Sequence, residues 1–136
     1  MIAIIDSGGA NIASVRFALE RLGVDSVLTA DPAVISAAER VILPGVGAAP
    51  VAMAQLARAG LVECIRGLTQ PVLGICLGMQ LLFERSEEGD TPLLGLVAGT
   101  CGAFDSGMGL TVPHMGWNRL VPQGEERHPL LLGVED

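Results

Sequence analysis

The deciding stretch is Pro-Val-Leu-Gly-Ile-Cys-Leu-Gly-Met-Gln-Leu-Leu-Phe-Glu-Arg, residues 71–85. The apolar run after Pro71 predicts a short buried strand at 72–75, and the composition from Gly78 to Arg85 predicts a helix. Between them, Gly-Ile-Cys-Leu-Gly is the pattern of a nucleophile elbow. The chain turns sharply there from strand to helix and leaves the middle residue, Cys76, strained and exposed at the edge of a sheet. We expect glycine on both sides because a Cβ there would collide with neighbouring elements.

The same alternation of strands and helices extends outward from this stretch. Short apolar runs that end at glycine or proline predict strands, whereas apolar residues at helical spacing predict helices. Strands that alternate with helices favour right-handed crossovers and a parallel sheet covered on both faces. The predicted fold class is therefore α/β, a doubly wound and mostly parallel sheet. The further predicted strands are 2–5, 26–29 and 41–43, and the further predicted helices are 12–22, closed by Gly23, and 51–66, interrupted near Gly60.

The pattern changes after the elbow, where acidic and glycine-rich segments separate short apolar runs such as 93–97. Residues 99–109 show no clear period, and we expect loops or the ends of antiparallel strands there. No internal repeat and no linker marks a boundary, so a single domain, 1–136, is predicted. An acidic run in this region favours a solvated loop. Its members are Glu84, Glu87, Glu88 and Asp90.

Composition excludes several classes of function. All eight basic residues are arginine, and the absence of lysine excludes a Walker phosphate loop and Schiff-base chemistry. The net charge of −7 disfavours nucleic acid as a partner. No run of about 18 apolar residues predicts a membrane span, and no metal or cofactor is expected. The cysteines, Cys64, Cys76 and Cys101, are odd in number and not closely paired, which favours a reduced, cytoplasmic protein.

Cys76 carries the chemical hypothesis, although burial as a structural residue is the commonest fate of a cysteine. A thiol at the start of a helix feels the positive end of the helix dipole, which favours the reactive thiolate. A second glycine-rich loop, Pro-Gly-Val-Gly at 44–47, follows another predicted strand. Functional loops of such sheets gather where the strands end, so this loop and the N–H of Leu77 are expected to form an oxyanion hole. Taken alone, the loop is more simply a plain turn.

Three segments of the sequence together carry a resemblance to a known family. They are Pro-Gly-Val-Gly at 44–47, Gly-Ile-Cys-Leu-Gly-Met-Gln-Leu-Leu-Phe-Glu at 74–84, and Val-Pro-His-Met-Gly-Trp-Asn at 112–118. The cysteine segment resembles the class I glutamine amidotransferases in general. In combination with it, the third segment resembles the glutaminase subunits of imidazole glycerol phosphate synthase, an enzyme of histidine biosynthesis. The similarity covers nearly the whole chain.

The resemblance implies a glutaminase that converts glutamine to glutamate and ammonia. Cys76 would be the nucleophile and would form a glutamyl thioester that water hydrolyses. The oxyanion would be stabilised by Leu77, Val46 and Gly47, and the glutamine would be held by Gly45, Gln80 and Glu88. Simpler readings remain for two of these residues, because Gln80 suits a solvent-facing helix position and Glu88 belongs to the acidic run.

The resemblance also implies a heterodimer with the cyclase subunit, a (β/α)₈ barrel that receives the ammonia. The third segment would face that partner, which makes His114 an interface residue more than a base. Trp117 is equally consistent with a core aromatic, and His128 with a surface loop. The implied interface residues are Pro113, His114, Met115, Gly116, Trp117 and Asn118.

The sequence lacks the catalytic base that belongs to the family pattern. A cysteine amidotransferase needs a histidine oriented by a carboxylate, which the family supplies as His-x-Glu on a later strand. The residues two beyond His114 and His128 are Gly116 and Leu130. The resemblance therefore implies a chain truncated at its C-terminus, without the last strands of the sheet and with an incomplete triad. The first loop, 6–11, and Ala49 after the Pro-Gly-Val-Gly loop also differ from the usual family residues, which affects local packing more than chemistry.

Three hypotheses stay open at this point. The first is an ammonia-producing glutaminase subunit. The second is a catalytically incompetent interaction subunit or fragment that retains the partner-facing surface. The third is a cysteine-dependent hydrolase of another elbow-bearing family that uses His114, and it is disfavoured because nothing in the sequence orients that histidine.

Overall fold

The computed structural model describes the chain except residues 9–11, 110, 113, 120, 122–128 and 134–136. It divides the chain into two compact units, Met1–Ala103 and Phe104–Asp136, and each unit is described by itself. No helix among the described residues is long and apolar enough to cross a membrane.

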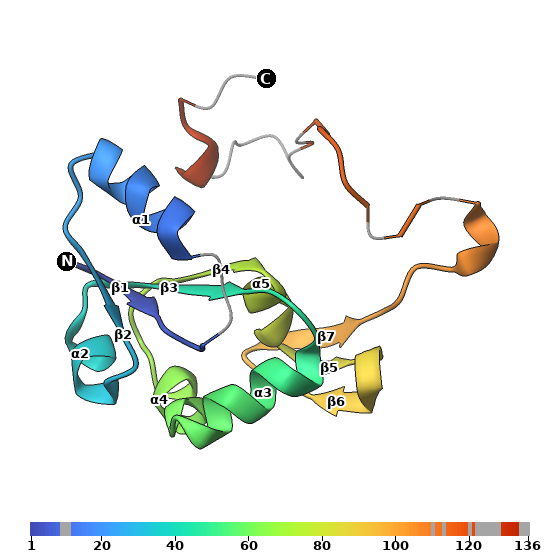
Figure 1. Cartoon of the computed structure of the whole chain (residues 1–136), viewed down its shortest axis with the longest axis horizontal. Coiled ribbons are helices and arrows are strands. Elements are labelled where there is room, and N and C mark those ends of the chain that lie inside the picture. Colours follow the sequence, from blue (N-terminus) through green and yellow to red (C-terminus); the bar gives the residue numbers. More distant parts are fainter. Residues whose placement is uncertain (9–11, 110, 113, 120, 122–128, 134–136) are drawn as a thin grey trace. The chain divides into compact units, whose positions relative to one another are not determined.

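The first unit is built on a parallel sheet of four strands in the order β2-β1-β3-β4 (Figure 1). Ile4 of β1 lies between Leu28 of β2 and Ile42 of β3, and Ile42 pairs in turn with Leu73 of β4. The predicted α/β fold with a parallel sheet is confirmed. The strands are β1 (Ile2–Ile5), β2 (Ser26–Thr29), β3 (Arg40–Gly45) and β4 (Val72–Cys76).

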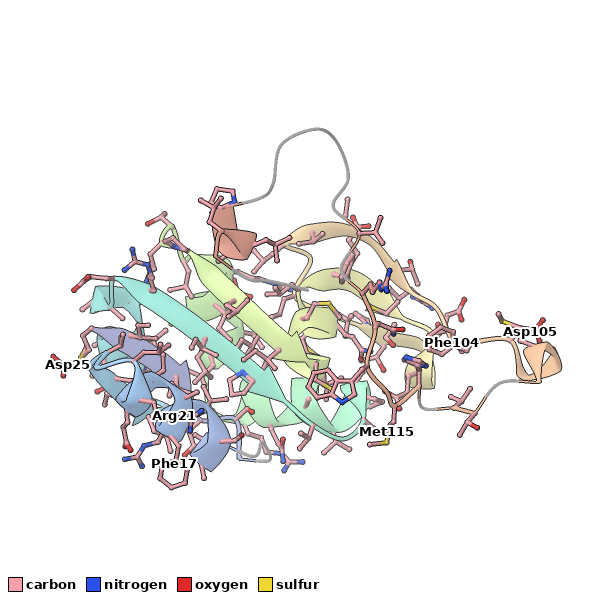
Figure 2. The ribbon with its side chains drawn as sticks, turned by 90° about the horizontal axis from the view of Figure 1, so that it is seen from above. Phe17, Arg21, Asp25, Phe104, Asp105 and Met115 are labelled. Carbon is pink, nitrogen blue, oxygen red and sulfur yellow. The ribbon has the colours of Figure 1, made fainter. Side chains whose placement is uncertain are left out.

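Helices cover the two faces of this sheet unequally (Figure 1). On one face, Leu19 of α1 (Ile12–Arg21) packs on Ile4 and Ile42, whereas Phe17 of the same helix is 57% exposed and points away from the sheet (Figure 2). On the other face lie helices whose buried side chains contribute, with residues of β1, β3 and α5 (Leu77–Leu81), to the larger core of the described residues. These helices are α2 (Pro32–Ala37), α3 (Ala49–Arg58) and α4 (Leu61–Arg66).

Local sequence explains where these helices begin and end. Gly23 takes φ +66° after α1, so its N–H reaches the Glu20 carbonyl and the N–H of Val24 reaches the Leu19 carbonyl, each at 3.0 Å. This is a Schellman C-cap, and the predicted stop at Gly23 is confirmed. Gly60, at φ +69°, likewise separates α3 from α4 as predicted.

Helix α2 was not predicted from the sequence, although its start carries a capping signal. The Asp31 carboxylate accepts the N–H of Ala33 at 2.8 Å, and Pro32 occupies the first helical turn. Aspartate followed by proline is a typical helix start. The helix is only 6 residues long, too short for its apolar periodicity to be recognised.

The helix predicted from Gly78 to Arg85 was wrong beyond its first turn. Helix α5 covers Leu77–Leu81, and β5 (Phe83–Ser86) follows. A longer helix would use the carbonyls of residues 81–83 for its own N–H groups. Instead, the backbone N–H groups of residues 94–97 donate to these carbonyls, with N···O distances of 2.8–3.0 Å.

A small second sheet results, in the order β6-β5-β7, with β6 (Thr91–Pro92) antiparallel and β7 (Val97–Cys101) parallel to β5. Residues 99–101 were predicted as loop or as the end of an antiparallel strand, and they belong to a strand that pairs in parallel. Gly99 lies within β7 at φ +125°, and the ring of Phe83 is next to it. Glycine is rare inside strands, so residue propensities did not predict a strand here.

β4 was predicted to be buried and is not. It is an edge strand of the parallel sheet, and Leu73 and Ile75 are 47% and 37% exposed. Both lie in register with the β3 residues Ile42 and Pro44. The apolar run was correctly interpreted as a strand, but the described part of the chain leaves one of its faces uncovered.

The described residues of the second unit include the short 3₁₀ turns η2 (Ser106–Met108) and η3 (Pro129–Leu131). The Asp105 carboxylate caps η2 by accepting the N–H of Gly107 at 2.8 Å. A hollow of about 510 Å³ lies within this unit, and three of its lining residues are labelled in Figure 2. The lining residues are Phe104, Asp105, Met108, Thr111, Val112, His114 and Met115.

Candidate active site

Cys76 occupies a strained turn at the end of β4. Its backbone has φ 55° and ψ −121° as the residue directly before α5, and its side chain is exposed. Among the described non-glycine residues, positive φ is confined to Cys76 and Asp90. A non-glycine residue in such a conformation costs about 1–3 kcal/mol and persists where the surroundings impose it, commonly at functional sites. The predicted strand-to-helix turn with a strained, exposed cysteine is therefore present.

Three glycines make this turn possible because other backbone atoms occupy the space of a Cβ. A Cβ on Gly74 would lie 2.5 Å from the Met79 Cα, and one on Gly78 would overlap the carbonyl oxygen of Leu43. A Cβ on Gly45 would lie 2.5 Å from the amide nitrogen of Gly78. The steric reason given for the flanking glycines is confirmed, and it extends to Gly45 on the neighbouring strand.

The Gly45–Gly47 segment starts beside the cysteine. Gly45, the last residue of β3, pairs in register with Cys76. Val46 is 49% exposed, and Gly47 has φ +91° with nothing within 4 Å of the position that a Cβ would occupy. The structure thus brings together the two glycine-rich loops that the sequence singled out. Backbone N–H groups near a nucleophile are the usual elements of an oxyanion hole.

Glu88 is joined to the end of this segment. Its Oε2 accepts the N–H of Ala49, the first residue of α3, at 2.8 Å. The residue before α3, Ala48, has no side chain that caps the helix. A carboxylate is well suited to an N-terminal N–H group of a helix, so Glu88 supplies from a distant segment the cap that the local sequence lacks.

The acidic run was expected to be a solvated loop. All four of its members are exposed, as expected, but Glu84 lies in β5 and the others lie in or next to the 3₁₀ turn Glu88–Asp90. Each of its carboxylates has a partner within the first unit, because they bond backbone N–H groups or an arginine. Glu84 accepts from Gly99 at 2.9 Å, Glu87 from Ala103 at 2.7 Å and Glu88 from Ala49 at 2.8 Å, while Asp90 pairs with Arg85.

The other proposed contacts in the first unit lie on α5. Leu77 is its first residue and is buried, which leaves its backbone N–H at the helix start beside Cys76. Gln80 is partly buried, and its carbonyl oxygen lies 3.6 Å from the Cys101 sulfur, which donates to it. Burial raises the pKa of the Cys101 thiol above its usual value, which disfavours the thiolate form of this second cysteine.

The third motif lies in the second unit, with Pro113 and His128 outside the described residues. Met115 is 87% and Trp117 103% exposed, so Trp117 is not a core aromatic in this structure. The side-chain Nδ2 of Asn118 lies 2.8 Å from Nε2 of His114, within hydrogen-bond distance. Gly116 also lies on the surface. Among the described residues, no group of three side chains is suited to hold a metal ion.

The parallel sheet and the strained cysteine turn beside a glycine-rich segment define a class I amidotransferase fold. The family model described as "Glutamine amidotransferase class-I" matches residues 3–134, and the chain belongs to this family. The names of two curated relatives are more specific than the name of the family. Both are described as "Imidazole glycerol phosphate synthase subunit HisH", from Xanthomonas euvesicatoria pv. vesicatoria (strain 85-10) and Xylella fastidiosa (strain Temecula1 / ATCC 700964).

Each relative is 57% identical over 135 residues, which cover 99% of this chain. The chain spans 66% of the length of each relative. A solved structure titled "Crystal structure of glutamine amidotransferase" aligns with a TM-score of 0.64 at 17% identity, covering 75% of this chain and 56% of that one. At this identity the likeness concerns the fold.

Proposed function

We propose that this chain is the glutaminase part of an imidazole glycerol phosphate synthase and converts glutamine to glutamate and ammonia. The observation that carries the proposal is the strained Cys76 turn, paired in register with the Gly45–Gly47 segment. The relatives named as HisH subunits support this reaction over other cysteine chemistries.

In the proposed mechanism, the Cys76 thiolate attacks the side-chain amide carbon of glutamine. The carbonyl oxygen becomes an oxyanion that accepts hydrogen bonds from the N–H of Leu77 and from the peptides of Val46 and Gly47. Collapse of the tetrahedral intermediate breaks the C–N bond, and the nitrogen takes up a proton and leaves as ammonia. Water then cleaves the glutamyl thioester, which restores the thiol and releases glutamate.

Three residues are proposed to hold the substrate. The Glu88 carboxylate has the charge to bind the α-ammonium group of glutamine, and it lies at the end of the segment that borders Cys76. Gln80, on the helix that follows the cysteine, and Gly45 complete the set. These roles follow the family motif, and the arrangement around β3, β4 and α5 supports them.

The proposed partner is the cyclase subunit, which receives the ammonia in the cytoplasm. The proposed interface comprises residues 113–118. An exposed tryptophan and methionine are typical of interface anchors, and Met115 and Trp117 are among the most exposed apolar residues described.

A second function is favoured by one observation. Neither histidine of the sequence belongs to a His-x-Glu pair, so the proton for the leaving nitrogen has no recognisable donor among residues 1–136. General acid–base catalysis is worth roughly 10²–10⁴-fold. A binding subunit without glutaminase activity is therefore the alternative.

One assay separates the two functions. Glutamine hydrolysis is measured for the 136-residue chain mixed with the cyclase subunit and its nucleotide ligand, beside the Cys76→Ala variant. Turnover that disappears in the variant supports the glutaminase. Binding to the cyclase without turnover supports the interaction subunit, and the absence of both would contradict the proposal.

A further inference from the structure

The Glu88 carboxylate accepts a hydrogen bond from the N–H of Ala49, the residue that directly follows the Gly45–Ala48 segment. Building on the proposed function, we propose that Glu88 is a positioning residue as well as a substrate contact. By holding the start of α3, it fixes the Gly45–Ala48 segment beside Cys76, so that one carboxylate links the substrate's ammonium group to the oxyanion peptides.

The segment is short and held at both ends. At one end, Gly45 is paired with Cys76 and packs so closely on α5 that a Cβ would meet the Gly78 nitrogen at 2.5 Å. At the other end, Ala49 is bonded to Glu88 at 2.8 Å. Only residues 46–48 lie between these points, so a shift of Ala49 must be taken up by the peptides proposed to stabilise the oxyanion.

The middle of the segment has little support of its own. Gly47 has φ +91° with nothing within 4 Å of the position that a Cβ would occupy, and Val46 is 49% exposed. Ala48 contributes no side-chain cap to α3. Because neither packing nor local capping fixes these peptides, their position depends on the two ends.

The turn that presents Glu88 is itself anchored. The Glu88 N–H donates to the Ser86 hydroxyl at 3.1 Å, and the Thr91 hydroxyl donates to the Glu88 carbonyl at 2.7 Å. Both hydroxyl-bearing residues are buried, at 4% and 7% exposure. The backbone of Glu88 is therefore held at its N–H and at its carbonyl by hydroxyl groups of buried residues.

Close packing joins the same turn to α3. Gly89, in the 3₁₀ turn η1 (Glu88–Asp90), has φ +64°, and a Cβ there would lie 2.6 Å from the Cγ of Pro50. Pro50 is the second residue of α3. The turn and the helix start are therefore in close contact, and the hydrogen bond from Ala49 to Glu88 is a polar connection between them.

The test compares Glu88→Gln with Glu88→Ala in the complex with the cyclase subunit. Glutamine at this position keeps an oxygen that can accept the Ala49 N–H but loses the charge that binds an ammonium group. Alanine removes both. Glu87→Ala is the matched control, because Glu87 is the preceding residue and its carboxylate also accepts a backbone N–H, that of Ala103 at 2.7 Å.

We expect Glu88→Gln to raise KM about 10-fold or more while kcat changes less than about 3-fold, since a lost charge contact weakens ground-state binding. Glu88→Ala is expected to raise KM similarly and also to lower kcat about 10-fold or more, because misplaced oxyanion donors act on the transition state. Equal kcat values for the two variants would overturn the positioning role.

A second readout needs no turnover and decides the proposal even if the chain is not a glutaminase. Backbone order parameters of Val46 and Gly47 are measured by NMR together with hydrogen exchange at Ala49. Glu88→Ala should lower the order parameters below about 0.6 and raise exchange at Ala49 about 5-fold or more, whereas Glu88→Gln and Glu87→Ala stay near the wild-type values. Faster exchange at Ala49 with unchanged Val46 and Gly47 would reduce Glu88 to a plain helix cap and overturn the proposal.

Discussion

Gly45 and Cys76 lie opposite each other in the parallel ladder between β3 and β4, each at the last position of its strand. Position 45 has no room for a Cβ, because the amide nitrogen of Gly78 lies 2.5 Å from the place that it would occupy. The cysteine, the glycine-rich segment and the helix start are thus one packing arrangement, and a side chain added to any of these glycines would disturb the other parts.

Gly78→Ala is expected to destabilise the fold strongly. The added methyl group would overlap the Leu43 carbonyl oxygen in the adjacent strand, and backbone atoms cannot move aside as a flexible side chain can. Severe overpacking of this kind costs about 3 kcal/mol or more, to be measured by urea unfolding. Gly116→Ala is the control because nothing lies within 4 Å of its Cβ position. Equal stability of the two variants would contradict the packing argument.

Cys76→Gly is expected to be more stable than Cys76→Ala by about 1–2 kcal/mol, because glycine relieves the strain of a positive φ. Both variants remove the thiol, so the comparison separates backbone strain from chemistry. Thermal or urea unfolding of the two proteins measures the difference. An alanine variant as stable as the glycine variant would mean that φ 55° carries no strain.

The elbow was predictable because its requirements are local. A sharp turn between a strand and a helix needs small residues at fixed offsets, and Gly74 and Gly78 flank Cys76 at those offsets. The same holds for the cap at Gly23 and the break at Gly60, where φ is positive.

The errors share a different cause, which is contact between distant segments. Helix α5 ends early because residues 94–97 bond to the carbonyls of residues 81–83, which a longer helix would need, and Glu88 reaches an N–H that lies 39 positions away along the chain. Neither contact leaves a signal in the periodicity or composition of a single segment. The role of Glu88 in capping α3 could therefore be found only from the structure.

Cys101 should make stability fall at alkaline pH. Burial raises the pKa of its thiol above the unfolded value of 9.0, so the folded chain holds the proton more tightly than the unfolded chain does. The contribution is fully present below pH 9.0 and is lost as the pH rises through the higher pKa of the folded state. Urea unfolding between neutral pH and the alkaline range should show this decline in the wild type and a smaller one in Cys101→Ala. Identical pH profiles would exclude Cys101 as the cause.

Strand β4 lies at the edge of the sheet and exposes apolar side chains, which predicts association between copies of the chain. Leu73 is 47% exposed on an edge strand, and an apolar edge with unpaired backbone groups is a template for strand pairing. Leu73→Lys should reduce association because lysine on an edge disfavours such pairing. Its free energy of unfolding should change by less than about 1 kcal/mol, since little burial is lost. Light scattering against concentration measures association. Leu43→Lys, at a fully buried position of β3, is the contrasting control and should unfold the chain. If Leu73→Lys associates as strongly as the wild type, the β4 edge is not the surface responsible.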